Sequence, residues 1–113
     1  MAERESGISL VLTTLPDEAT AAQLARRLVD EQLIACGNVV PGLTSIYRWE
    51  GVTERAREVL LVMKTREELV QRLFERAARL HPYEVPELVA LRATDVADTY
   101  ARWLRDETIE VNG

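Results

Sequence analysis

The sequence predicts an α+β fold in which two helices cover one face of a four-stranded sheet and a third helix follows at the C-terminus. Three observations lead to it. Four segments rich in β-branched and apolar residues are typical of strands, and two segments between them carry apolar residues at helical spacing. In addition, no repeat, low-complexity tract or linker divides the 113 residues. We therefore expect one domain over residues 1–113, with residues 1–7 as a flexible tail.

The first strand and the first helix follow each other directly. Residues Ile8–Leu15 are β-branched or apolar for the most part and end at Pro16, which is typical of a strand. Asp17 and Glu18 then place negative charge at a helix start, where the helix dipole favours it. The apolar stripe of this helix consists of Ala21, Leu24, Ala25, Leu28, Val29 and Leu33. We expect the helix to fade between residues 35 and 37.

The second and third strands are predicted to form a long hairpin. Residues Val39–Trp49 have strand character, but Pro41-Gly42 interrupts them and predicts a bulge or a bend at a sheet edge. Glu50-Gly51 then starts a turn. The third strand, Glu58–Lys64, has a continuous apolar centre, which is typical of a strand buried on both faces.

A second helix is predicted after the third strand. Thr65 and Glu68 match a capping box, in which each side chain satisfies a free amide at the helix start. The apolar stripe that follows consists of Leu69, Val70, Leu73, Phe74 and Ala77. The helix should end at His81-Pro82, because a residue that precedes proline is pushed out of the helical region.

The last two elements are a fourth strand at Leu88–Ala93 and a final helix that opens at Asp95 or Asp98. We expect this helix to point Tyr100, Trp103 and Leu104 inward. The complete order is strand, helix, strand, strand, helix, strand, helix. It corresponds to the split βαβ, or ferredoxin-like, plan with one additional helix.

The predicted sheet has one face that no helix covers. Its strands are apolar on both faces, and the hairpin carries Tyr47 and Trp49 near its tip. Exposed apolar sheet invites a partner. We therefore expect self-association, with Tyr47 and Trp49 at the interface between subunits.

Composition excludes several classes of partner. Nineteen acidic residues against fourteen basic ones give a net charge of −5, which argues against binding to nucleic acid or to an anionic membrane surface. No apolar run approaches the ~18 residues that span a bilayer. The first six residues are too polar for a signal peptide, and one cysteine makes no internal disulfide. These features favour a cytoplasmic protein.

The functions that this fold can carry need residues that are missing here. RNA recognition needs aromatic residues on the central strands, and a soft-metal chaperone needs a Cys-x-x-Cys loop. A phosphate-handling enzyme would want glycines in the loop after the first strand, where Thr13–Glu18 has none. Only one histidine is present, and no motif places a serine or Cys36 beside it as a nucleophile. The sequence therefore predicts a protein that is not an enzyme.

The segment Leu80–Glu87 concentrates side chains capable of chemistry. It holds the only histidine, His81, between residues that stiffen the backbone, together with a tyrosine and two carboxylates. One interpretation makes His81 a cap that meets the free carbonyls at a helix end. The other makes it an imidazole ligand for copper or zinc, which would need further ligands such as Cys36, Met63, carboxylates or another subunit.

Two other residues allow both a structural and a functional interpretation. Cys36 sits where the first helix is expected to end, among small and apolar residues, so a buried unreactive thiol is favoured over a metal ligand. Lys64 is the only lysine and lies at the end of a buried strand. It is either a cation for a ligand pocket or a side chain that reaches water from the strand end.

Several motifs together resemble the CutA family of divalent-cation-tolerance proteins. The first runs from Ala35 to Gly51 as Ala-Cys-x-Asn-x-x-Pro-Gly-x-Thr-Ser-x-Tyr-x-Trp-Glu-Gly. The others are Glu58–Thr65, the run His-Pro-Tyr-Glu-Val-Pro-Glu at 81–87, and Tyr-x-x-Trp-Leu at 100–104. The resemblance extends from about Val11 to Trp103, in order and without large gaps.

This resemblance implies a fold, an assembly and a role. It implies a ferredoxin-like subunit in a tight homotrimer, similar in architecture to the PII signalling proteins, with the hairpin strands meeting neighbouring subunits. It also implies a non-enzymatic role in tolerance of copper and other divalent cations, with no required cofactor but with copper or another divalent cation as a ligand. Some bacterial relatives carry proposed copper ligands, a cysteine at the position of Thr13 and a histidine at the position of Leu80, which this chain lacks.

The resemblance also implies a second kind of site, a cleft between subunits. Its predicted lining consists of Trp49, Lys64, Tyr83, Glu84 and Glu87. A small anionic ligand there would pair with Lys64. Three functions therefore remain open: a trimer for the response to divalent metals, with His81 and Cys36 as metal candidates; a PII-like sensor of a small ligand; and a purely structural or adaptor trimer.

Overall fold

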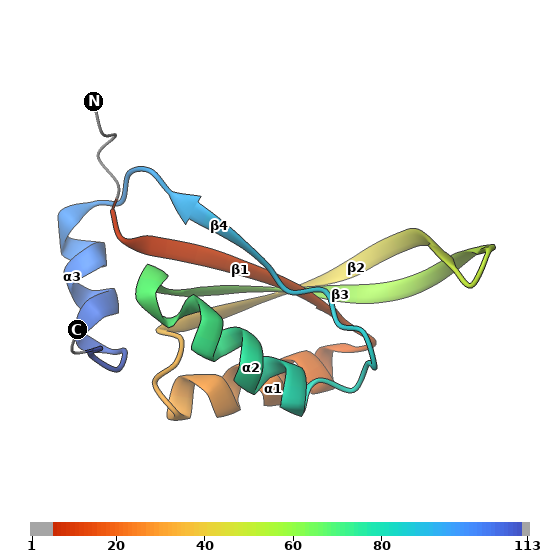
Figure 1. Cartoon of the computed structure of the whole chain (residues 1–113), viewed down its shortest axis with the longest axis horizontal. Helices are drawn as coiled ribbons and strands as arrows, with labels where there is room; N and C mark the ends of the chain where they lie inside the picture. Colours follow the sequence, from red (N-terminus) through yellow and green to blue (C-terminus); the bar gives the residue numbers. More distant parts are fainter. Residues whose placement is uncertain (1–5, 112–113) are drawn as a thin grey trace.

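A computed structural model describes residues 6–111 of the chain, arranged as one four-stranded antiparallel sheet with helices against it (Figure 1). In chain order the elements are β1 (Ile8–Leu15), α1 (Glu18–Asp30), β2 (Cys36–Trp49), β3 (Val52–Arg66), the short 3₁₀ helix η1 (Glu67–Leu69), α2 (Val70–Leu80), β4 (Val89–Ala93) and α3 (Asp98–Asp106). The strand order is β2-β3-β1-β4, which confirms the predicted ferredoxin-like plan.

The core lies between the sheet and the two helices α1 and α2. Alternate residues of β1 are buried against them, and Leu61 and Met63 of β3 join the same layer. The bounds of β1 are those that the sequence predicts. No helix within residues 6–111 combines the length and the apolar character that crossing a bilayer demands.

Helix α1 begins as predicted but ends earlier than expected. The side chain of Asp17 accepts a hydrogen bond from the backbone N–H of Thr20 at 2.7 Å, which caps the helix start. The helix ends at Asp30, so the expected fading near residues 35–37 is wrong. Gln32 has a φ of 60° and turns the chain, and Leu33 is then buried in an irregular link rather than on a helix. Cys36 is consequently the first residue of β2 and does not sit at a helix end.

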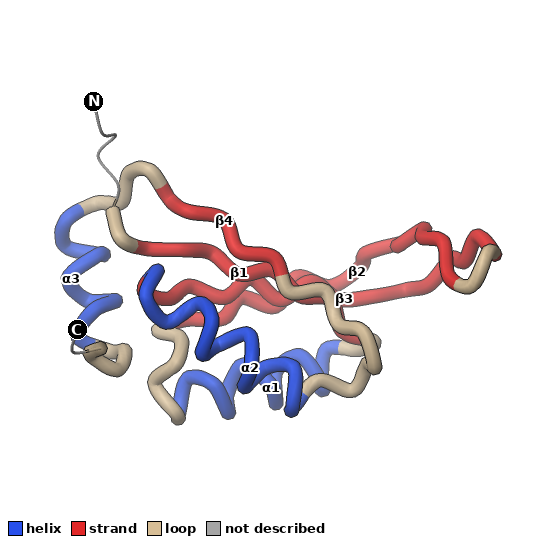
Figure 2. The backbone as a smooth tube through the Cα atoms, in the orientation of Figure 1, coloured by secondary structure: helices blue, strands red, loops and turns tan. Residues whose placement is uncertain are grey.

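The β2–β3 hairpin reaches out beyond the rest of the subunit as a two-stranded arm (Figure 2). Its register shifts between Val40 and Leu43, which confirms the predicted irregularity at Pro41-Gly42. Glu50 and Gly51 have φ values of 51° and 82° and connect Trp49 to Val52. Positive φ at both central residues is typical of a two-residue hairpin turn whose twist matches that of the strands.

The central apolar run of β3 is not buried on both faces within one chain. Val59, Leu61, Met63 and Thr65 are buried beneath the helices, whereas the residues between them are only partly buried. Two helices cover one side, and nothing among residues 6–111 covers the other. The expectation of a strand buried twice therefore needs a second molecule.

The predicted capping box at Thr65 and Glu68 is wrong. Thr65 is still part of β3, and its hydroxyl donates a hydrogen bond of 2.7 Å to the carbonyl oxygen of Leu33. η1 starts after Arg66 without a side-chain cap. The hydroxyl binds the buried link after α1, because an uncompensated carbonyl in the core costs more than an open helix end at the surface.

Helix α3 lies beside the end of the sheet and buries Ala101 and Leu104. It begins at Asp98, one of the two predicted positions. Tyr100 and Trp103 are 37% and 42% exposed, so the expectation that they point inward is wrong. Their rings contact each other with centroids 5.4 Å apart.

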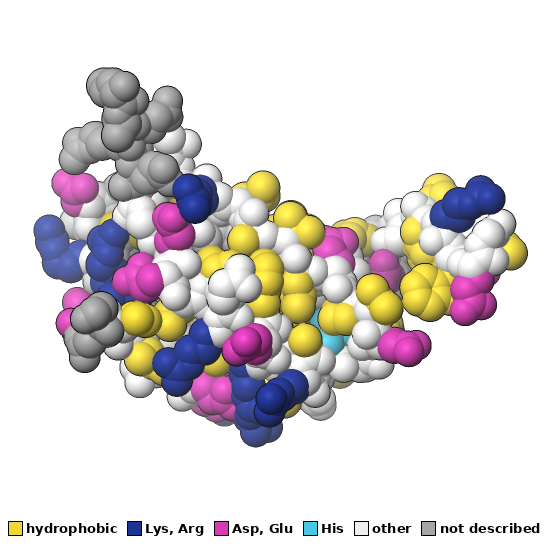
Figure 3. Space-filling model, in the orientation of Figure 1, with side chains coloured by type: hydrophobic (Ala, Val, Ile, Leu, Met, Phe, Trp, Pro, Cys, Tyr) yellow, Lys and Arg dark blue, Asp and Glu magenta, His cyan; other side chains and the backbone are white. Residues whose placement is uncertain are grey.

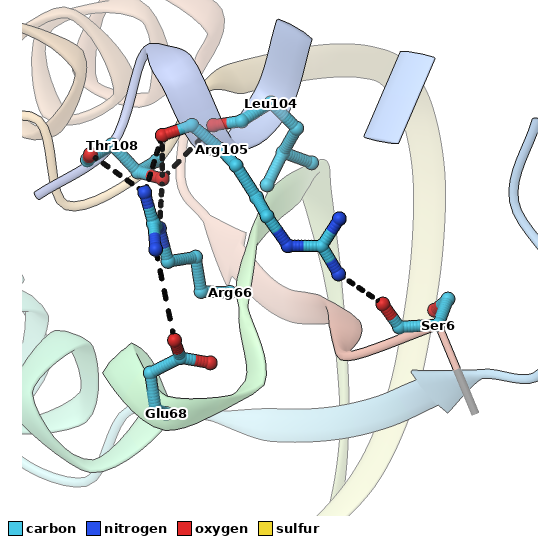
Figure 4. Close-up of polar contacts among 6 residues, drawn as sticks. All are labelled: Ser6, Arg66, Glu68, Leu104, Arg105 and Thr108. Atoms are coloured by element: carbon cyan, nitrogen blue, oxygen red, sulfur yellow. Dashed lines mark hydrogen bonds and ion pairs between the residues drawn. The ribbon is translucent and has the colours of Figure 1, made fainter. Parts of the chain in front are cut away.

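A pair of arginines ties α3 and the segment after it to the sheet (Figure 4). Arg66 donates to the Thr108 hydroxyl at 2.8 Å and to the carbonyl oxygens of Arg105 and Thr108, and it pairs with Glu68 at 3.7 Å. Arg105 in turn donates to the carbonyl oxygen of Ser6. Carbonyls at a helix end have no partner within the helix, and Arg66 supplies donors for them.

We predict that Thr65→Val lowers the free energy of unfolding by about 1–3 kcal/mol, because it leaves the buried carbonyl of Leu33 without a donor. Urea denaturation at one protein concentration measures the change. Thr44→Val on the exposed part of β2 is the matched control and should stay near wild type. Equal stability of both variants would show that the Thr65 hydroxyl contributes nothing.

Candidate functional site

The candidate site lies where the connector between α2 and β4 crosses the end of β1. Helix α2 ends at Leu80, and His81 is extended with φ −75° and ψ 140°, as the following proline requires. This conformation turns the imidazole under the connector. His81 is buried, with 7% of its surface exposed.

Both ring nitrogens of His81 are engaged. Nδ1 accepts a hydrogen bond from the backbone N–H of Tyr83 at 3.1 Å. Nε2 therefore carries the proton of the neutral ring and donates to the carbonyl oxygen of Thr14 at 2.9 Å, with the Thr13 hydroxyl at 3.1 Å. Burial lowers the pKa of His81, against smaller opposing effects of the Thr14 carbonyl and the Glu58 charge. The neutral imidazole holds the connector against β1.

Tyr83 extends this cluster to the hairpin. Its ring contacts that of His81 with centroids 4.9 Å apart, and its hydroxyl donates to Glu58 Oε2 at 2.7 Å. Burial raises the pKa of the Tyr83 hydroxyl, and the bond to Glu58 raises it further. The tyrosine thus remains a proton donor, and Glu58 is held on the connector side of β3.

The structure does not bring the two metal candidates together within one chain. Cys36 pairs in register with Lys64, whereas His81 contacts Thr13 and Thr14, which pair with Leu61 and Leu60. These positions are three to four residues apart along β3, about 10–13 Å of strand. Cys36 Sγ instead lies 3.7 Å from Asn38 Oδ1. Within residues 6–111, no group of three or more histidine, cysteine, aspartate or glutamate side chains is arranged to hold a metal.

One predicted neighbour of His81 is where the resemblance suggests. Thr13, at the position that carries cysteine in some bacterial relatives, contacts His81 directly, so a thiolate there would lie beside the imidazole. With threonine in place, the contact is a hydrogen bond. The metal roles of His81 and Cys36 stay predictions, and His81 would have to give up one of its present bonds to bind an ion.

The predicted cleft residues are spread along the subunit. Trp49 lies at the hairpin tip opposite Val52, and Lys64 is twelve residues further along β3, about 40 Å of extended strand. Tyr83 lies between them, bonded to Glu58. Lys64 itself has its Nζ 6.0 Å from the ring centroid of Tyr100. One chain alone therefore does not form this cleft, which needs residues from more than one subunit.

Sequence reasoning missed the bond between Tyr83 and Glu58 and the contact of Lys64 with Tyr100. Each joins residues more than twenty positions apart, and no short motif signals such pairs. The charge of Glu58 next to an apolar strand was the one available signal, because a carboxylate at the edge of a buried run needs a donor.

The described geometry defines a class of protein: a ferredoxin-like subunit with a long hairpin arm, a histidine-anchored connector and an uncovered apolar sheet face. The model of the CutA1 divalent ion tolerance protein family matches residues 9–107. This chain belongs to the CutA1 family.

Named relatives and solved structures agree with this assignment. A divalent-cation tolerance protein CutA of Thermus thermophilus is 48% identical over 99 residues, covering 88% of this chain and 96% of the relative. A chloroplastic CutA of Arabidopsis thaliana is 41% identical, and the chain spans 54% of its length. The crystal structure of CutA1 from Oryza sativa superimposes with a TM-score of 0.89 at 38% identity, covering 92% of this chain and 95% of that one.

We predict that stability falls as the pH is lowered from 7.5 to 5.5 and that His81→Gln removes most of this dependence. The folded pKa of His81 lies below the model value of 6.5, so the unfolded chain takes up the proton first. The contribution is complete above the unfolded pKa and is lost as the pH falls toward the folded one.

Urea denaturation across this pH range tests the prediction, and the assignment is unambiguous because His81 is the only histidine. The Asp and Glu side chains titrate largely below this range, and the pKa of Glu31 is held at about 2 by Arg76 and Arg27. Parallel pH profiles of wild type and His81→Gln would contradict the proposed neutral anchor.

Proposed function

We propose that this chain is a non-enzymatic, cytoplasmic homotrimer that acts in the cellular response to divalent metal cations, with copper or another divalent cation as its ligand. Membership of the CutA1 family is the observation that carries the metal role, because the family and its bacterial relatives are named for divalent-cation tolerance. The cytoplasmic location rests on the single cysteine. Relatives with chloroplastic and periplasmic names make localisation a point to measure.

The uncovered face of the sheet supports assembly. Partly buried or exposed apolar side chains line it across all four strands: Leu10, Leu12, Val40, Leu60, Val62, Val89 and Leu91. A contiguous apolar face of this kind is rare on a monomer. The hairpin arm adds exposed Tyr47 and Trp49, at 45% and 46% exposure, which suit an interface rich in aromatic residues.

A metal site in such a trimer would be built around His81. Its imidazole is the only one in the chain, and borderline metals such as Cu²⁺ and Zn²⁺ favour imidazole nitrogen. One imidazole per subunit does not make a tight site, so thiolate or carboxylate ligands from a second subunit would complete it. The alternative, a small anionic ligand between subunits, is favoured by the position of Lys64 beside an exposed aromatic ring.

We predict that the protein has a mass in solution of three chains of 12.8 kDa each, and that Leu91→Glu shifts it toward one chain. Leu91 is 49% exposed in the subunit, so a charge there spares the subunit core but is costly in an apolar interface. Val29→Glu, at a 38% exposed position on α1, is the matched control and should stay trimeric.

Light scattering coupled to size-exclusion chromatography at micromolar concentration gives the mass. A wild-type mass of a single chain would overturn the assembly. A Leu91→Glu protein that remains trimeric would place the interface elsewhere than on the uncovered face.

Copper binding is expected to depend on His81. Calorimetric titration with Cu²⁺ should show binding to the wild type and its loss in His81→Ala. Tyr83→Phe perturbs the same connector and removes the bond to Glu58, yet keeps the imidazole and the backbone donor to Nδ1, so it should still bind. Equal heats for wild type and His81→Ala would leave His81 as a structural anchor alone.

A further inference from the structure

A groove on the helical side of the subunit combines an apolar floor with a rim of arginines. It lies between α2, the link after α1 and the segment after α3, with a volume of about 470 Å³. Leu33 and Ile109 form its floor, and Arg72, Arg76 and Arg79 line it from α2. Their spacing of four and three residues places all three on one helix face, over about 10 Å. Figure 3 shows basic side chains gathered over the helices in the lower part of the view.

One of these arginines is already engaged. Arg76 donates to Glu31 through Nε at 2.9 Å and Nη2 at 2.8 Å, and Arg27 donates to the same carboxylate at 2.8 Å. Two arginines thus share one carboxylate. The arrangement fixes Arg76 and leaves positive charge in excess.

The other two arginines have no partner. Among residues 6–111, no hydrogen bond or ion pair engages the side chain of Arg72 or Arg79, and both are exposed. Glu75 lies between them on α2. Counting Arg27, Arg72, Arg76 and Arg79 against Glu31 and Glu75 gives a local charge of +2, whereas the whole chain carries −5. A positive groove on an acidic protein selects anions.

The walls of the groove are held in place by bonds already described. The backbone N–H of Ile109 donates to the carbonyl oxygen of Gln32 at 3.0 Å, which ties the segment after α3 to the link after α1. Thr108, its neighbour, is held by Arg66 (Figure 4). A wall fixed by backbone and arginine contacts needs little ordering when a ligand binds.

We propose that this groove binds a small organic anion that carries phosphate or carboxylate groups at the arginine rim and an apolar body against Leu33 and Ile109. Guanidinium groups match both kinds of anionic group through paired N–H donors. The volume lies in the range of small-molecule sites. The groove is on the side of the sheet opposite to the uncovered face, so it stays open in a trimer joined through that face. The inference depends neither on metal binding nor on the oligomeric state.

The test is calorimetric titration at low salt with ATP as the phosphate probe and citrate as the carboxylate probe, both without metal. We expect at least one to bind, and the double variant Arg72→Ala/Arg79→Ala to weaken binding at least about tenfold, because two charge-assisted contacts are lost. The matched control, Arg26→Ala/Arg102→Ala, removes the same charge from exposed helix positions outside the groove and should bind like wild type.

Two further measurements sharpen the result. Glu75→Gln removes the carboxylate between the two free arginines and should tighten binding. Adenosine, which lacks the phosphates, should not bind if ATP does. Absence of binding by both anions, equal binding of ATP and adenosine, or an equal loss in both double-arginine variants would overturn the proposal.

Discussion

Helix coverage of only one face of a sheet that is apolar on both faces is the constraint on which the rest of this structure depends. β1 and β3 are central strands, and their alternate side chains are buried under α1 and α2 while the intervening ones are not. Hydrophobic burial is the main stabilising term in small domains, so half of the available apolar surface stays unused in one subunit. Assembly through this face therefore follows from the fold itself.

The same constraint places the histidine. The connector from α2 must return across the end of β1 to reach β4 at the sheet edge, and His81 fixes the crossing by donating to β1 and accepting from Tyr83. A metal would compete with both bonds, since a ligating nitrogen needs a free lone pair. Structural anchoring and metal binding are thus opposed uses of one imidazole, and any ion would have to compensate for a lost contact to β1.

Local patterns in the sequence predicted most of the fold. The limits of β1, the hairpin turn at Glu50-Gly51 and the end of α2 before a proline all rest on neighbouring residues. The two clear errors, the end of α1 and the capping box, have one cause: the bond from Thr65 to the carbonyl of Leu33. It joins positions 32 residues apart, so neither the apolar stripe nor the capping motif contains it. The site behaved likewise, because its residues were found by motif but their partners were not.

The two sides of the subunit carry chemically different surfaces. The sheet side is apolar and suits other copies of the chain, whereas the helical side carries a positive groove that the acidic chain as a whole would not suggest. Arg66 links the sides, because it leaves β3 and holds the segment that forms the groove wall. Since Ser6 and Arg105 tie the start of β1 to the same segment, a shift of β1 on assembly would reach the groove through fixed contacts. Assembly and anion binding are therefore separable sites on one continuous framework of hydrogen bonds.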